Sequence, residues 1–244
     1  MFPLKDHNPT RRTPVVTIAL VAINIVVFFY EMTLGDSLPR FVAAYGVIPY
    51  EIVHFADLVG YHGGPFEHAA GPPFLPLTLL TSMFMHGSVM HIFGNMLYLW
   101  IFGNNVEDLM GRVKFLVFYL ACGIAAGFSH ILSNPGSTTP TVGASGAVAG
   151  VLGAYLVTYP RARVLTAVVI PFFIRLIEVP ASVLLVLWFV MQSLQGFLSL
   201  GASEVTGGVA WFAHIGGFVT GILGAFLLAG GEIRRIRAAG SGRR

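Results

Sequence analysis

Six long apolar runs constrain the fold of this chain more than any other feature. A helix needs about 20 apolar residues to cross the roughly 30 Å hydrocarbon core of a bilayer. Charged residues make up 10% of the 244 residues, against roughly 25% in an ordinary soluble domain. We therefore expect an all-α membrane protein, a bundle of six transmembrane helices. The runs are 15–34, 86–103, 115–132, 143–158, 180–200 and 207–229.

A shorter apolar stretch, 164–177, is a weaker candidate for a seventh span. Pro171 interrupts it, Arg175 lies within it and Glu178 follows it directly. A proline inside a helix removes a backbone hydrogen bond, and a charge inside the bilayer is costly. We expect this stretch to lie at the membrane interface or to re-enter the membrane without crossing it.

The distribution of Lys and Arg predicts that both termini are cytoplasmic. Short loops rich in these residues stay on the cytoplasmic side. With six spans Arg40 is the one basic side chain left outside, whereas a seventh span would place the last five arginines outside. Residues 1–14 and 231–244 are then cytoplasmic tails that flank a six-span domain, 15–230. The basic residues form no stripe with interleaved aromatic residues, so no nucleic-acid partner is expected.

The first external connection, about residues 35–85, is the longest in the chain. It is too apolar to be simply solvated, because it carries Phe41, Tyr45, Phe55 and Phe74 among other apolar residues. Long loops of this kind are usually functional or disordered. We expect short helices that rest in the outer membrane interface.

Polar side chains inside spans are costly and indicate a functional site. His91 and Asn95 lie in the second run, Ser145 lies in the fourth and His214 lies in the sixth. If the N-terminus is cytoplasmic, these three runs all begin at the external side, so His91, Ser145 and His214 lie at similar depth. His91 and Asn95 are four positions apart and share one helix face.

Small residues predict that the fourth and sixth runs pack closely. His214 begins a face that continues through Gly217, Gly221 and Gly224, and Gly and Ala fill most positions from 143 to 154. Such small-residue stripes let helix backbones approach one another. We therefore expect Ser145 and His214 to come within hydrogen-bond distance.

A serine beside an imidazole base is the minimal nucleophilic pair. The fourth and sixth runs contain no Asp or Glu, so a dyad is expected, although a loop carboxylate such as Asp57 stays open as a third member. Acyl transfer also needs donors for the developing oxyanion, and Asn95, His91 and the backbone N–H of Ser145 are the candidates.

These residues resemble those of the rhomboid intramembrane serine proteases, of the bacterial six-span type. The resemblance rests on three separated motifs in the expected order, and together they cover nearly the whole chain from the first run to the sixth. They are His86 with His91-Ile92-Phe93-Gly94-Asn95, Gly143-Ala144-Ser145-Gly146 and Ala213-His214-Ile215-Gly216-Gly217.

The resemblance implies a role for each matched residue. Ser145 would be the nucleophile, His214 the general base and later the acid, and His91, Asn95 and the Gly143–Ser145 region the oxyanion site. The residues implied to be structural are His86, Gly146, Gly217, Gly221 and Glu107, the last at the cytoplasmic end of the second span. The first loop resembles the membrane-embedded loop of the family, and the fifth span resembles its proposed lateral gate.

Two positions depart from the family pattern. Some members carry a Trp-Arg pair in the first loop, where this chain has Leu77-Thr78. Many carry an aromatic residue four positions after the serine, stacked on the catalytic imidazole, where this chain has Ala149. Another group must therefore hold His214.

The function expected from these observations is that of a serine endopeptidase in a bacterial plasma membrane. It would cleave transmembrane segments of other membrane proteins near the external face, through an acyl-enzyme. No metal or organic cofactor is expected, since the chain has one cysteine, Cys122, and no His-Glu-x-x-His motif. The alternative is a non-proteolytic rhomboid-fold protein that binds membrane clients, against which the presence of both Ser145 and His214 argues. A channel or transporter would predict more charge inside the spans or a repeated half.

Overall fold

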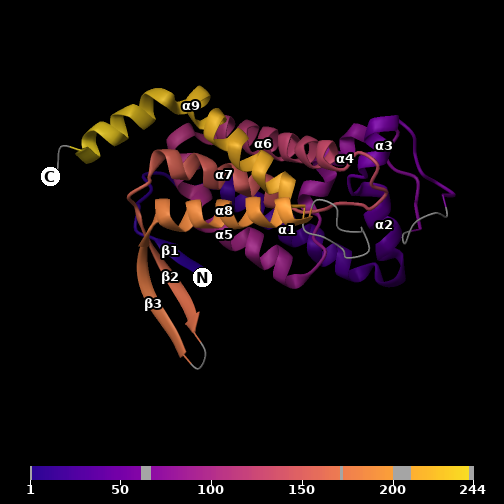
Figure 1. Cartoon of the computed structure of the whole chain (residues 1–244), viewed down its shortest axis with the longest axis horizontal. Coiled ribbons are helices and arrows are strands. Elements are labelled where there is room, and N and C mark those ends of the chain that lie inside the picture. Colours follow the sequence, from indigo (N-terminus) through magenta and orange to yellow (C-terminus); the bar gives the residue numbers. More distant parts are fainter. Residues whose placement is uncertain (1, 62–66, 171–172, 200–209, 242–244) are drawn as a thin grey trace.

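Each predicted apolar run contains one main helix in the computed structural model (Figure 1), which describes residues 2–61, 67–170, 173–199 and 210–241. Residues 200 and 207–209 of the fifth and sixth runs lie outside the described residues. By length and composition, α1, α6, α8 and α9 could each cross a membrane. The mostly helical membrane architecture is therefore confirmed, while the count of six spans stays a prediction. The helices are α1 (Val15–Thr33), α5 (Val89–Met110), α6 (Arg112–Ser133), α7 (Ser145–Thr158), α8 (Ala181–Ser199) and α9 (Trp211–Ser241).

Short helices fill the long first connection, as predicted. They lie at one end of the bundle, and both chain termini lie toward the other end (Figure 1). Val47, Ile52 and Leu79 pack there against Ile131 of α6 in a small apolar cluster of their own. The helices are η1 (Gly35–Ser37), α2 (Leu38–Tyr45), α3 (Pro49–His54), η2 (Leu75–Leu77), α4 (Thr78–Thr81) and η3 (Ser82–Phe84).

A three-stranded antiparallel sheet stands at the end of the bundle where the termini lie. Its strands are β1 (Phe2–Asp6), β2 (Arg163–Ile170) and β3 (Phe173–Pro180), in the order β1-β2-β3. The stretch predicted to be interfacial or re-entrant thus forms strands that project sideways from the helices (Figure 1). Its many Val, Thr and Ile residues favour strands. The N-terminal segment, predicted to be a cytoplasmic tail, supplies the third strand.

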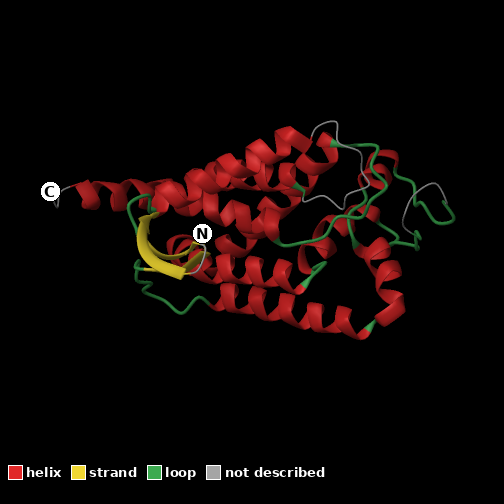
Figure 2. Cartoon of the chain, turned by 60° about the horizontal axis from the view of Figure 1, so that its bottom comes forward, coloured by secondary structure: helices red, strands yellow, loops and turns green. Residues whose placement is uncertain are grey.

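Helix α9 continues well past the predicted end of the membrane domain. It runs to Ser241, with a break in helical geometry at Ala229 (φ −141°, ψ 22°), where two glycines follow. The predicted basic tail, 231–244, is thus helical as far as Ser241, and residues 242–244 lie outside the described residues. The Ala, Arg and Glu residues beyond the glycines are good helix formers and resume the helix. Figure 2 shows this segment projecting from the bundle.

The predicted close packing of the fourth and sixth runs is confirmed. A methyl group added at Gly217 would lie 2.0 Å from the Gly146 carbonyl oxygen, and one at Gly221 would lie 2.0 Å from that of Gly150. Backbone thus meets backbone between α7 and α9, with no side chain between them. Gly224 does not extend this contact, because it lies against the Phe118 ring of α6.

Glu107 of α5 holds the start of α1. Its carboxylate accepts hydrogen bonds from the backbone N–H groups of Val16 (3.0 Å) and Thr17 (2.8 Å), and from the Thr17 hydroxyl (2.8 Å). The N-cap residue of α1 is Pro14, whose side chain offers no acceptor. Because the first N–H groups of a helix lack partners within it, Glu107 supplies the missing cap from another helix. This explains why an acidic residue stands at that end of α5.

Gly221→Ala is expected to lower the unfolding temperature of the detergent-solubilised protein. The added methyl would overlap the Gly150 carbonyl, and overpacking of this kind costs about 1–3 kcal/mol. A thiol-reactive dye can follow unfolding, because the one cysteine, Cys122, is buried. Gly231→Ala is the matched control in the same helix, since a methyl there meets nothing within 4 Å. Equal unfolding temperatures for the two variants would contradict the close packing of α7 and α9.

Glu107→Ala is expected to destabilise the protein through the start of α1. The change leaves two backbone N–H groups without their acceptor, and the loss of a helix cap costs about 0.5–2 kcal/mol. The same dye assay measures the effect. Asp108→Ala is the control, because the neighbouring Asp108 accepts one exposed hydrogen bond, from the backbone N–H of Arg11. A loss no larger than that of the control would show that Glu107 does not anchor α1.

Candidate active site

Ser145 and His214 meet where α7 and α9 begin. Ser145 is the first residue of α7, and His214 lies in the first turn of α9. The Ser145 Oγ and the His214 Nε2 are 2.7 Å apart, which is a hydrogen bond. His214 is buried, with 8% of its surface exposed. The glycine contacts between the two helices allow this distance, since side chains between the backbones would hold them apart.

The second ring nitrogen of His214 is bonded to a residue that sequence reasoning missed. The Nδ1 of His214 lies 2.5 Å from the Oε1 of Gln192 in α8. Asp57, the carboxylate left open as a third member, instead accepts the backbone N–H groups of Val59 and Gly71 within its own loop. Gln192 is a polar residue inside a predicted span, and that criterion, applied to the fifth run, would have identified it.

Two tryptophans flank the ring of His214. The ring centroid of Trp188 in α8 is 5.9 Å from that of His214, and that of Trp211 in α9 is 6.1 Å away at an angle of 88°. Ala149, at the position where many relatives carry a stacking aromatic, is fully buried within the core. The indole rings of Trp188 and Trp211 therefore border the imidazole, whereas position 149 supplies no ring.

His91 lies close to Ser145 on the side of α5. Ser88 caps α5 by accepting the backbone N–H of His91 at 3.2 Å, which fixes His91 in the first turn. Gly143 adopts a positive φ of 135°, and a methyl group there would lie 2.7 Å from two atoms of the His91 ring. Gly143 thus leaves space for the imidazole, while its own N–H donates to the Ser82 carbonyl at 2.8 Å.

Asn95 and His86 complete the polar surroundings of His91. Asn95 is buried, and its Nδ2 finds no hydrogen-bond partner among the described residues. The His86 ring meets the His91 ring edge-on, with centroids 5.1 Å apart. The backbone N–H of His86 donates to Glu31 of α1 at 3.1 Å. Helix α5 thus carries His91 and Asn95 four positions apart, with the His86 ring against His91.

A small cavity of about 40 Å³ adjoins Ser145 on the side facing α6. Gly146 borders it, and a methyl there would lie 2.4 Å from the Ala126 side chain. Thr141 and His130, whose side chains are hydrogen-bonded at 3.0 Å, also line it. A space of this size with polar walls can hold a water molecule.

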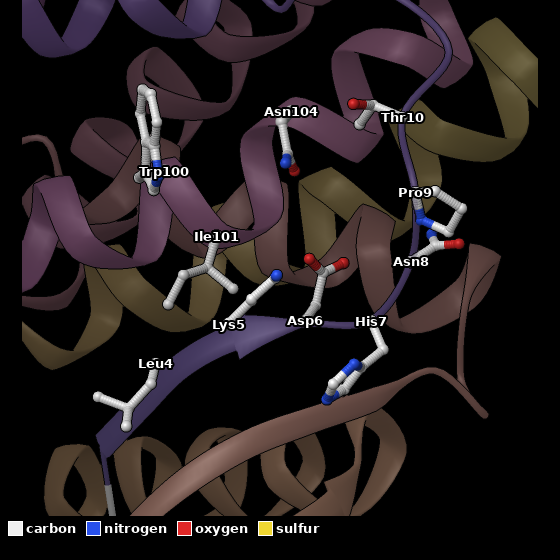
Figure 3. Close-up of a pocket in the computed structure, with 10 residues that line it drawn as sticks. All are labelled: Leu4, Lys5, Asp6, His7, Asn8, Pro9, Thr10, Trp100, Ile101 and Asn104. Atoms are coloured by element: carbon white, nitrogen blue, oxygen red, sulfur yellow. The ribbon is translucent and has the colours of Figure 1, made fainter.

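A larger pocket than this cavity lies elsewhere, between β1 and α5 (Figure 3), with a volume of about 490 Å³. Its buried carboxylate, Asp6, accepts hydrogen bonds from the Tyr155 hydroxyl (2.7 Å) and the Asn105 amide (2.8 Å). Burial raises the pKa of Asp6 above its ordinary value. Tyr155 is roughly 15 Å along α7 from Ser145, at 1.5 Å of rise per residue. This carboxylate ties the N-terminal strand to the bundle and takes no part in the Ser145 site.

A family model described as Rhomboid domain matches residues 76–231, more than half of the chain. Rhomboid protein 1, mitochondrial, of Saccharomyces cerevisiae is 27% identical over 172 residues, 67% of this chain and 46% of that protein. Rhomboid protease GluP of Bacillus subtilis is 31% identical over 150 residues, 62% of this chain and 25% of that protein.

A human relative, the presenilin-associated rhomboid-like protein, mitochondrial, is 33% identical over 97 residues, 39% of this chain and 25% of that protein. The chain thus spans less than half the length of each of these relatives. The relatives include both a protein named as a protease and proteins named only as rhomboid-like. The family match covers every element from α4 to the break in α9, including all the residues of the Ser145 site. This chain therefore belongs to the rhomboid family.

Proposed function

We propose that this protein is an intramembrane serine endopeptidase with Ser145 as nucleophile and His214 as general base. The observation that carries the proposal is the 2.7 Å hydrogen bond between the Ser145 Oγ and the His214 Nε2. A serine hydroxyl becomes a nucleophile when such a base removes its proton. Membership of the rhomboid family and the similarity to a named rhomboid protease support the same reaction.

The first half of the reaction forms an acyl-enzyme. The Ser145 Oγ attacks the scissile carbonyl carbon while the His214 Nε2 takes the hydroxyl proton. The tetrahedral intermediate collapses as the protonated His214 gives this proton to the leaving amine, which departs with the C-terminal fragment. The N-terminal fragment stays bonded to Ser145 as an ester.

The oxyanion donors proposed are Asn95, His91 and the backbone N–H of Ser145. Asn95 presents a buried amide Nδ2 without a partner among the described residues, so it is ready to donate. The His91 ring lies beside Gly143, two residues from the nucleophile. The N–H of Ser145 belongs to the first turn of α7, where backbone donors lack partners within the helix and the helix dipole favours negative charge. The N–H of Gly143 already donates to the Ser82 carbonyl, so Gly143 is not proposed as an oxyanion donor. Its contribution is the lack of a side chain, which leaves space for the His91 ring.

Water completes the reaction by hydrolysing the ester. His214 takes a proton from the water and returns it to Ser145, so the enzyme ends as it began. The polar cavity beside Ser145 can hold that water molecule.

The substrates proposed are transmembrane segments of other membrane proteins. The Ser145 site adjoins the first connection, since Val47, Leu79 and Ser82 line the same cavity as Ser145. The short helices of that connection lie at the end of the bundle away from the termini (Figure 1). With both termini in the cytoplasm of a bacterium, cleavage takes place toward the external face of the plasma membrane. A substrate must be extended for attack, so helix-destabilising residues and small side chains are expected near the cleaved bond.

Ser145→Ala and His214→Ala are each expected to abolish cleavage, lowering kcat/KM by at least about 10³-fold. The assay uses purified protein in liposomes with a panel of single-span substrates, and mass spectrometry locates the cut. Thermal unfolding of both variants checks that the fold is intact. Equal cleavage by the variants would identify a contaminating protease. Client binding without cleavage by the native protein would favour a rhomboid-fold binding protein.

Asn95→Ala is expected to lower kcat by about 10²–10³-fold with little change in KM, as for the loss of one oxyanion donor. The amide would act only when charge develops on the oxygen, so substrate binding should not depend on it. Asn104→Ala is the control on the same helix, since Asn104 borders the distant pocket near β1. A fall in kcat/KM that lies entirely in KM would place Asn95 in substrate binding instead.

A further inference from the structure

We propose that Gln192 of α8 is the positioning residue of His214 and sets which ring nitrogen carries the proton. This inference rests on the proposed function, in which His214 acts as the base. It starts from the hydrogen bond between the His214 Nδ1 and the Gln192 Oε1, at 2.5 Å. Gln192 does not touch Ser145 in any described contact, so it acts through the histidine.

The direction of this hydrogen bond decides whether His214 can serve as a base. An amide oxygen only accepts, so the Nδ1 of a neutral imidazole must donate to it. The proton then resides on Nδ1, and Nε2 offers its lone pair to the Ser145 hydroxyl at 2.7 Å. The opposite tautomer would present an N–H to Ser145 and could not accept its proton. Gln192 therefore does for His214 what the orienting carboxylate does in a Ser-His-Asp triad.

An amide suits this position better than a carboxylate because the site is buried. A charge taken out of water is costly unless it is paired and hydrogen-bonded. The neutral amide orients the ring without adding a buried charge. It also gives less electrostatic support to the imidazolium that forms during the reaction. The other titratable groups that act on His214 are His91 of α5 and His130 of α6, so no described carboxylate offsets that charge.

Packing between α8 and α9 holds Gln192 in register with His214. The Phe189 ring stacks on Phe218 of α9 at 4.5 Å, and Trp188 lies 6.0 Å from the same ring. Away from this contact α8 is largely uncovered, with more than half of the surface of Val190 and Leu194 exposed. Helix α8 is thus a peripheral helix, and its polar contact with His214 is made by the Gln192 side chain. Displacing α8 from α9 would remove the acceptor from His214.

The first test compares Gln192→Met with Gln192→Glu. Methionine keeps the length of the side chain without an acceptor, so kcat is expected to fall about 10²-fold or more with KM unchanged. Glutamate keeps the acceptor and is expected to retain activity. Its charge favours the imidazolium, so the acidic limb of the kcat/KM profile should move to higher pH. Gln195→Met, the same change at an exposed position of α8, is the control and should match the native enzyme.

The second test reads the tautomer directly and does not depend on proteolysis. The protein is labelled with ¹⁵N-histidine, and the resonances of His214 are identified by their loss in His214→Ala. The native protein is expected to show a protonated Nδ1 and an unprotonated Nε2, and Gln192→Met a mixture of both forms. An unchanged tautomer in Gln192→Met, or an unprotonated Nδ1 in the native protein, would overturn the role of Gln192. Absence of cleavage with the expected tautomer shift would instead overturn only the proposed function.

Discussion

The close approach of α7 and α9 is the constraint on which the site depends. At Gly217 and Gly221 the space that a side chain would need is already filled by carbonyl groups of α7. In a bilayer, helices gain little from hiding apolar surface from one another, since lipid is equally apolar, so close packing of this kind is a main source of association. The same contact brings a hydroxyl at the start of one helix to an imidazole at the start of the other. Stability and chemistry thus share one interface.

Three polar groups of the site stand near helix starts. Ser145 begins α7, while His91 and His214 lie in the first turns of α5 and α9. The first backbone N–H groups of a helix lack partners within it and carry a partial positive charge. Three helix starts therefore converge on the place where negative charge would develop in acyl transfer. The surrounding glycines and alanines let these groups approach without adding bulk.

The apolar runs predicted the long helices because their length and composition leave few alternatives in a membrane. The Ser145–His214 contact was predictable as well, since the glycine stripe and similar depth place both residues on one interface. Its polar side chain inside a predicted span could have marked Gln192 as a candidate, but its contact with His214 depends on how α8 is rotated against α9, which rests on contacts such as Phe189 with Phe218. The pairing of β1 was missed because its partner β2 is distant in the sequence, whereas β2 and β3 are neighbours whose apolar run was interpreted as a membrane-associated stretch. Nor did the sequence indicate that the Gly143 N–H donates to the Ser82 carbonyl of η3, because that hydrogen bond joins two segments distant in the chain.

The pairing of β1 with β2 has a consequence for the order in which the chain assembles. Pro3 lies opposite Thr166, so the first strand of the protein finds its partner only after four long helices have been synthesised. Contacts so far apart in sequence are slow to form, because a large loop must close before they stabilise anything. Until then Asp6 has no Tyr155 or Asn105 to bind. We therefore expect β1 to pair late in folding, and this pairing fixes the ends of α5 and α7 far from Ser145.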